Sequence, residues 1–123
     1  MFRYNLTRVW RIVKQHGTGD EKMKQALIFT GGWDGHEPKE TGNLVKTMLE
    51  EAGFAVTLTD SLACLEDAEG LKTFDLIVPV WTMGRLTGDA SAHLRAAVAA
   101  GTGLAGWHGG MGNAFREDTE YQF

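Results

Sequence analysis

From residue 25 onward, short apolar runs alternate with longer segments of mixed polarity. The apolar runs lie at 25–31, 55–59, 75–81 and 103–107, and we predict a β-strand at each of them. Residues 76–81 are all apolar, which is typical of a strand that is buried on both faces. Pro79 lies inside this run and has no N–H to donate, so we expect a local irregularity there.

The segments between these runs have helical features. In residues 39–53, apolar side chains recur on one helical face and Gly53 gives a stop signal. Residues 88–101 predict a second helix, residues 61–74 have some helical character, and 109–117 are expected to begin another helix. Strands that alternate with helices form right-handed βαβ units. We therefore predict an α/β fold with a flavodoxin-like open parallel sheet, strand order 2-1-3-4, and helices on both faces.

The first 22 residues differ from the rest of the chain. They carry basic residues, and their apolar residues share one face of a possible helix: Phe2, Leu6, Val9, Trp10 and Val13. One interpretation is a basic amphipathic helix for a membrane surface or a partner. The interpretation that we prefer makes 1–22 an N-terminal appendage of a domain that spans 23–123, because open α/β domains commonly begin close to their first strand.

Composition narrows the class of protein. The chain has 123 residues, 43% of them hydrophobic and 23% charged, as expected for one soluble domain. It has a net charge of −4, and its basic residues are concentrated in the first 22 positions, so the acidic remainder argues against nucleic acid as a partner. No apolar run approaches the roughly 20 residues of a membrane span. The lone Cys64 cannot form an intramolecular disulfide, which favours a reducing, cytoplasmic location.

Chemically versatile residues follow the predicted strands. Ligands of open parallel sheets bind beyond the carboxyl ends of the strands, where strand order reverses. We expect His108, His36 and Asp34 to be catalytic, because imidazole and carboxylate groups transfer protons near neutral pH. Flat aromatic rings beside carboxylate and amide groups suit a small sugar ligand. The predicted ligand-binding residues are Trp33, Glu37, Trp81, Asn113 and Arg116.

The residues at this edge also bear on two other ligand types, a nucleotide and a metal ion. The glycine-rich turn 109–112 lacks the spacing of both common nucleotide-binding motifs, which argues against a nucleotide. His36 and His108 could together hold zinc. Strands one and four would lie about 9.6 Å apart in the predicted order, so the two loops would have to lean together by several ångströms.

Three stretches resemble a known family: ALIFTGGWDGHEPKETGNLVKTMLEEAGF, FDLIVPVWTMG and AAGTGLAGWHGGMGNAFR. They are similar to the trehalose-utilisation (ThuA-like) family, within the class I glutamine amidotransferase-like superfamily. The resemblance implies a flavodoxin-like fold and a role in the metabolism of trehalose or related sugars. In the amidotransferases a G-x-C-x-G turn carries a nucleophilic cysteine. Here residues 106–110 read GWHGG, with His108 at the place of that cysteine, so glutamine hydrolysis is not implied.

Members of the family are longer than this chain, so we expect a C-terminal truncation. The fourth strand would then be an exposed sheet edge through which copies of the chain could form a homo-oligomer. Three hypotheses about function follow. The chain is a sugar hydrolase, isomerase or epimerase with His108 as acid–base, or it holds a metal on His36 and His108, or it is a non-catalytic sugar-binding module.

Overall fold

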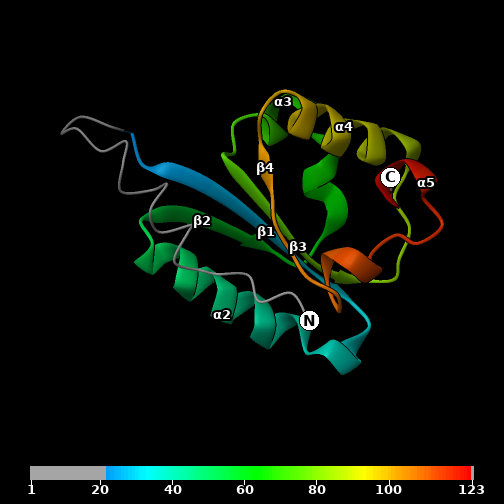
Figure 1. Cartoon of the computed structure of the whole chain (residues 1–123), viewed down its shortest axis with the longest axis horizontal. Helices are drawn as coiled ribbons and strands as arrows, with labels where there is room; N and C mark the ends of the chain where they lie inside the picture. Colours follow the sequence, from blue (N-terminus) through cyan, green and yellow to red (C-terminus); the bar gives the residue numbers. More distant parts are fainter. Residues whose placement is uncertain (1–21, 123) are drawn as a thin grey trace.

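The structure, a computed structural model, describes residues 22–122, so the apolar residues singled out between Phe2 and Val13 lie outside the described part. Four parallel strands form one sheet in the order β2-β1-β3-β4 (Figure 1). The strands are β1 (Lys24–Gly32), β2 (Phe54–Thr59), β3 (Leu76–Thr82) and β4 (Gly103–Leu104). The helices are α2 (Pro38–Glu51), α3 (Ala68–Leu71), α4 (Gly88–Ala99) and α5 (Thr119–Gln122). Three 3-10 turns complete the described chain: η1 (Asp34–His36), η2 (Leu62–Glu66) and η3 (Met111–Asn113). The predicted flavodoxin-like α/β fold and strand order are confirmed.

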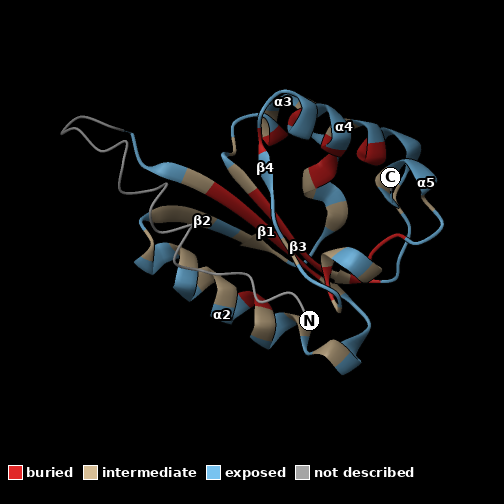
Figure 2. Cartoon of the chain, viewed as in Figure 1, coloured by how far each residue is buried: buried red, intermediate tan, exposed pale blue. Residues whose placement is uncertain are grey.

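Strand β1 is the centre of the sheet. It pairs with β2 from Lys24 to Phe29 and with β3 from Ala26 to Gly32. Parallel neighbours need crossover connections, and these place α2 on one face of the sheet and α3 and α4 on the other (Figure 1). The segment 26–30 is therefore buried throughout (Figure 2).

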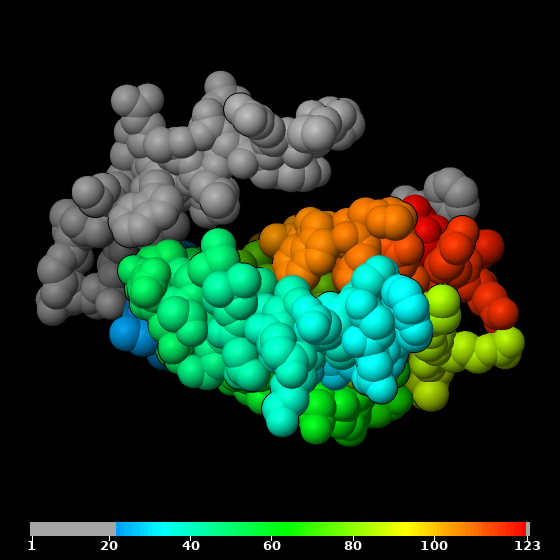
Figure 3. Space-filling model, turned by 90° about the horizontal axis from the view of Figure 1, so that it is seen from below, coloured from blue at the N-terminus to red at the C-terminus, as the bar shows by residue number. Residues whose placement is uncertain are grey.

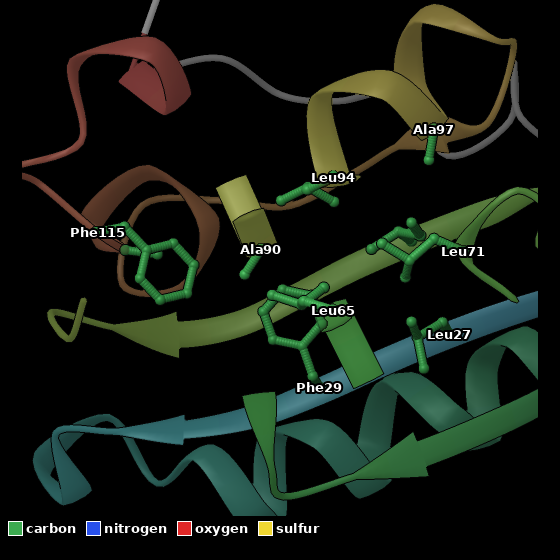
Figure 4. Close-up of a cluster of buried hydrophobic side chains, with 10 residues drawn as sticks. Leu27, Phe29, Leu65, Leu71, Ala90, Leu94, Ala97 and Phe115 are labelled. Atoms are coloured by element: carbon green, nitrogen blue, oxygen red, sulfur yellow. The ribbon is translucent and has the colours of Figure 1, made fainter. Parts of the chain in front are cut away.

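The core consists of two clusters, one on each face of the sheet. Successive strand side chains point to opposite faces, so Leu27 and Phe29 pack toward α4, whereas Ile28 packs toward α2. Figure 4 shows the cluster on the α4 side, in which side chains of η2, α3 and α4 cover β1. Full burial of each large aliphatic or aromatic side chain stabilises the fold by about 1.5–3 kcal/mol.

Pro79 shortens β4 and leaves β3 regular. The expected irregularity is wrong, since β3 pairs with β1 in continuous register through Phe29 and Pro79. The carbonyl of Ile77 accepts the N–H of Ala105 (3.1 Å), so alternate residues of β3, Pro79 included, face β4. Proline has no N–H with which to extend that ladder. The fourth strand accordingly covers Gly103–Leu104 instead of the predicted 103–107. Association of copies through this edge stays a prediction.

The expected helix at 109–117 is also wrong. The chain forms the short turn η3 and then extends, so that Ala114 makes a parallel bridge with Met83. Met83 N donates to the carbonyl of Asn113 (2.9 Å), and Phe115 N donates to the carbonyl of Met83 (3.1 Å). These bonds hold the backbone beside the end of β3, and they use groups that a helix would need for itself.

Within residues 22–122, no helix combines the length and apolar character that crossing a membrane requires.

Helix α2 lies close against β1 at Gly42. A Cβ atom added there would lie 2.3 Å from Cγ2 of Thr30, whose own side chain is buried. We expect Gly42→Ala to lower the free energy of unfolding by about 1–3 kcal/mol, because α2 or Thr30 would have to shift. Urea denaturation measures the loss.

Gly88 provides the matched control for Gly42. It begins α4, and a Cβ there would meet nothing within 4 Å. Gly88→Ala should be neutral or stabilising by up to about 1 kcal/mol, because alanine favours helix. Equal destabilisation by both substitutions would contradict the close approach of α2 to β1.

Tyr121 holds η3 in place from α5. Its hydroxyl donates to the carbonyl of Met111 (2.9 Å), its ring packs edge-on against Phe115 (centroids 5.2 Å apart), and burial raises its pKa to about 12. An unfolded tyrosine ionises near pH ~10. The stabilisation linked to this proton is therefore complete below about pH 10 and is lost as pH rises towards 12.

We expect Tyr121→Phe to flatten the alkaline fall in unfolding free energy. Denaturation of the wild type and the variant at about pH 9 and about pH 11 measures the difference. If both proteins lose the same stability between these pH values, the proton on Tyr121 does not contribute.

Candidate functional site

Three segments meet at the carboxyl edge of the sheet. They follow β1 (33–37), β3 (83–84) and β4 (105–113), and β3 lies between the other two strands. In Figure 3 the cyan surface of the segment after β1 lies directly beside the orange surface of the turn after β4. The connections from β1 and β3 leave in opposite directions, which makes this edge the switch point where such sheets bind ligands.

His36 is the imidazole held most firmly at this edge. It lies in η1, is half-buried, and its Nδ1 is 2.8 Å from Oγ1 of Thr82. The Thr82 side chain is buried at the end of β3, and its hydroxyl donates to the carbonyl of Gly109 (3.1 Å). One hydroxyl thus joins the segments after β1, β3 and β4.

The turn that carries His108 passes close to the His36 ring. A Cβ atom added at Gly109 would lie 3.5 Å from Cε1 of His36. Gly109 also has φ +86°, a left-handed conformation that glycine adopts without strain. The loops after strands one and four therefore lean together, as a zinc site on His36 and His108 would require.

Asn113 stabilises this turn through two hydrogen bonds within it. Its side-chain oxygen accepts the N–H of Gly109, and its own N–H donates to the carbonyl of Gly110 (3.1 Å). The predicted ligand-binding amide is thereby engaged in the turn. Arg116 lies exposed beyond it.

Two indole rings are exposed at the same edge. Trp33 is 52% exposed and packs edge-on against His36, with ring centroids 4.7 Å apart. The backbone N–H of Trp33 donates to the carbonyl of Thr82 (3.2 Å). Trp107 is 37% exposed, and a Cβ atom added at Gly110 would lie 3.4 Å from its ring. Both rings offer apolar faces to a ligand.

The predicted carboxylates lie to one side of His36. Asp34 is exposed and lines a cleft of about 560 Å³ at the ends of β1 and β2, together with Lys39, Asn43 and Asp60. Glu37 is exposed at the start of α2. Among the described hydrogen bonds, none joins either carboxylate to the His36 ring.

His108 and Trp81 differ in their surroundings. His108 is exposed on the turn after β4, and no hydrogen bond within residues 22–122 reaches its ring. Trp81 turns to the opposite face of the sheet and packs against Phe29 and Phe115, with centroids 6.4 and 6.5 Å away. The structure thus brings Trp33, His36 and the His108 turn together and packs the partly buried Trp81 against the core.

The site predicted from sequence omitted Thr82 and Trp107. Thr82 follows the predicted third strand directly, and the alternation of side chains places it on the opposite face from Trp81. The alternation along the strand shows that only one of Trp81 and Thr82 can face the site. It does not show which of the two residues does so. The apolar pattern places Trp107 in the fourth strand, but that strand ends at Leu104 in the structure.

Metal and thiol chemistry have less support in the geometry. Across residues 22–122, no group of three or more His, Cys, Asp or Glu side chains could hold a metal ion. A zinc site on His36 and His108 stays a prediction. Cys64 is half-buried against the core on the α4 side, and this burial raises its thiol pKa, as expected for a packed cysteine.

Comparison with known proteins connects this fold with a biological role. A protein-family model described as "ThuA: Trehalose utilisation" matches residues 25–123. Neither the curated proteins nor the solved structures gave a match. The family description indicates a role in carbohydrate metabolism. Because the match extends over the whole sheet and the segments at its carboxyl edge, the chain belongs to the ThuA trehalose-utilisation family.

Proposed function

We propose that this chain processes trehalose or a related disaccharide, and that His36 and His108 transfer protons to or from the sugar. The observation that carries the proposal is the fixed position of His36 between Thr82, Trp33 and the His108 turn. Imidazole is the side chain best suited to proton transfer near neutral pH.

The geometry supports His36 as the principal acid–base group. Its Nδ1 is engaged with Thr82, and among residues 22–122 no group hydrogen bonds to its Nε2. That nitrogen can therefore act on a bound substrate. The more exposed His108 is carried on the adjoining turn and serves as the second proton carrier.

The neighbouring groups support a sugar as the substrate. The exposed faces of Trp33 and Trp107 can cover the apolar C–H face of a sugar ring. The cleft beside Asp34 supplies carboxylate, amide and ammonium groups for hydroxyls, from Asp60, Asn43 and Lys39. Its volume of about 560 Å³ lies within the usual range of small-molecule sites.

A non-catalytic sugar-binding module is the second candidate. It is favoured by the absence, among the described hydrogen bonds, of any carboxylate bound to the His36 ring. Binding would then depend on the tryptophans and the cleft alone, with no turnover of the sugar.

The first prediction concerns turnover. We expect the full chain to convert trehalose, or another disaccharide of a panel followed by proton NMR. His36→Gln should lower kcat by about 100- to 10,000-fold with little change in affinity, since a positioned acid–base group contributes that much. His108→Gln should show a smaller loss.

His93 is the matched control, because its Nδ1 bonds to the carbonyl of Leu65 (2.9 Å) on the α4 side of the sheet. His93→Gln should keep the turnover number. Saturable binding without conversion by the wild type would support the binding module instead. A chain that neither binds nor converts any disaccharide would contradict both candidates.

The second prediction concerns binding. Trp33→Ala should raise the Kd for the bound disaccharide about tenfold, which is a loss of about 1.4 kcal/mol in binding free energy. Trp33→Phe keeps an aromatic ring and should retain most of the wild-type affinity. Isothermal titration calorimetry measures both values. Leu44→Ala is the control, since Leu44 is 61% exposed on α2. Unchanged affinity in Trp33→Ala would mean that the indole does not contact the sugar.

A further inference from the structure

The buried hydroxyl of Thr82 lies between two partners that differ in what they can donate. Its Oγ1 is 2.8 Å from Nδ1 of His36 and 3.1 Å from the carbonyl oxygen of Gly109. A carbonyl oxygen can only accept, and a hydroxyl has one proton to donate. Both hydrogen bonds therefore form together only if Thr82 donates to the carbonyl of Gly109 and accepts a hydrogen bond from the Nδ1–H group of His36.

We propose that Thr82 is a positioning residue that holds neutral His36 as its Nδ1–H tautomer and leaves a basic lone pair on Nε2. In the other tautomer Nδ1 would itself need a donor. The Thr82 proton would have to turn towards it, and the Gly109 carbonyl would lose the one donor that residues 22–122 supply to it. A buried polar group without a partner is costly, so the two tautomers are not equivalent here.

Thr82 is rigid enough for this role. Its side chain is 3% exposed, and β-branching restricts its χ1 angle. Its backbone carbonyl also accepts the N–H of Trp33 (3.2 Å), so the loop that carries His36 is tied to Thr82 through both backbone and side chain. On the other side, Asn113 accepts the N–H of Gly109 and fixes the acceptor of the Thr82 hydroxyl. His36, Thr82 and Gly109 are thus each held by at least one contact besides the two hydrogen bonds of the Thr82 hydroxyl.

This tautomer supplies what the proposed function requires, and in that respect the inference rests on it. When a sugar hydroxyl gives up its proton, the O–H bond breaks and an N–H bond forms at Nε2. The ring becomes imidazolium, still donating from Nδ1 to Thr82, and the substrate oxygen takes the electron pair of the broken bond. The reverse step returns the proton and restores the neutral ring. Thr82 keeps the same hydrogen bonds throughout, so neither step requires it to rearrange.

The test observes the tautomer directly and does not depend on turnover. The full chain labelled with ¹⁵N-histidine is studied by long-range ¹H–¹⁵N correlation, at a pH where the imidazoles are neutral. His36→Gln identifies the signals of His36. We expect the wild type to show a protonated Nδ1 and an unprotonated Nε2 at His36. Thr82→Val, which removes the hydroxyl and keeps the shape, should lose this pattern, and Thr82→Ser should retain it.

Thr102 is the matched control at the opposite end of the sheet. It is also buried, and its hydroxyl donates to the carbonyl of Phe74 (2.9 Å). Thr102→Val loses a comparable buried hydrogen bond and should leave the His36 pattern unchanged. An Nε2–H pattern in the wild type, or an unaltered Nδ1–H pattern in folded Thr82→Val, would overturn the inference. If Thr82→Val does not fold, the wild-type and Thr82→Ser spectra still decide.

Kinetics then separate the two proposals. If the chain converts a disaccharide, Thr82→Val should lower kcat about 10- to 100-fold with little change in KM, and Thr82→Ser should recover most of it. An Nδ1–H signature that Thr82→Val abolishes, in a chain without turnover, would confirm the role of Thr82 and contradict the proposed enzymatic function. Turnover in a chain whose His36 carries its proton on Nε2 would support the enzymatic function and contradict the proposed role of Thr82.

Discussion

The pairing of β1 with β3 is the contact on which the site depends. Its register, from Ala26 opposite Leu76 to Gly32 opposite Thr82, ends both strands at the same level. The segment that carries His36 therefore leaves the sheet beside the last residue of β3. Because side chains alternate along a strand, a slip of one residue would exchange the positions of Trp81 and Thr82. The indole of Trp81 would then lie beside His36, in the place of the Thr82 hydroxyl.

The early end of β4 brings the third segment to the site. Pro79 cannot extend the ladder, so the chain is released after Ala105 and turns back over the edge of the sheet. Gly109 then lies close to the His36 ring, and the bridge between Met83 and Ala114 holds the returning chain beside the end of β3. A longer fourth strand would carry His108 further from His36. This turn presents the imidazole of His108, and its Gly109 lies near the better anchored His36.

Thr82 connects these segments because it is buried and polar. Its hydroxyl and its carbonyl together hold His36, Gly109 and Trp33, which come from two different loops. A buried hydroxyl is stable only while its partners remain in place, so the position of each loop is coupled to that of the other. The apolar surfaces of Trp33 and Trp107 remain exposed around this polar centre. Such an arrangement suits a ligand with both hydroxyl groups and C–H faces, in keeping with a family named for the use of trehalose.

The sequence by itself was sufficient for the fold class, the strand order and the positions of most elements. Apolar runs such as 76–81 and the helical spacing around Val45 and Leu49 are local signals, and the handedness of βαβ units leaves few topologies. It also located Trp33, His36 and His108, because parallel strands release their chains at a common edge. The tertiary structure decided the length of β4, the extended path after η3 and the choice between Trp81 and Thr82. Each of these depends on hydrogen bonds or register between segments distant in sequence, such as Ile77 with Ala105, and no local pattern records such partners.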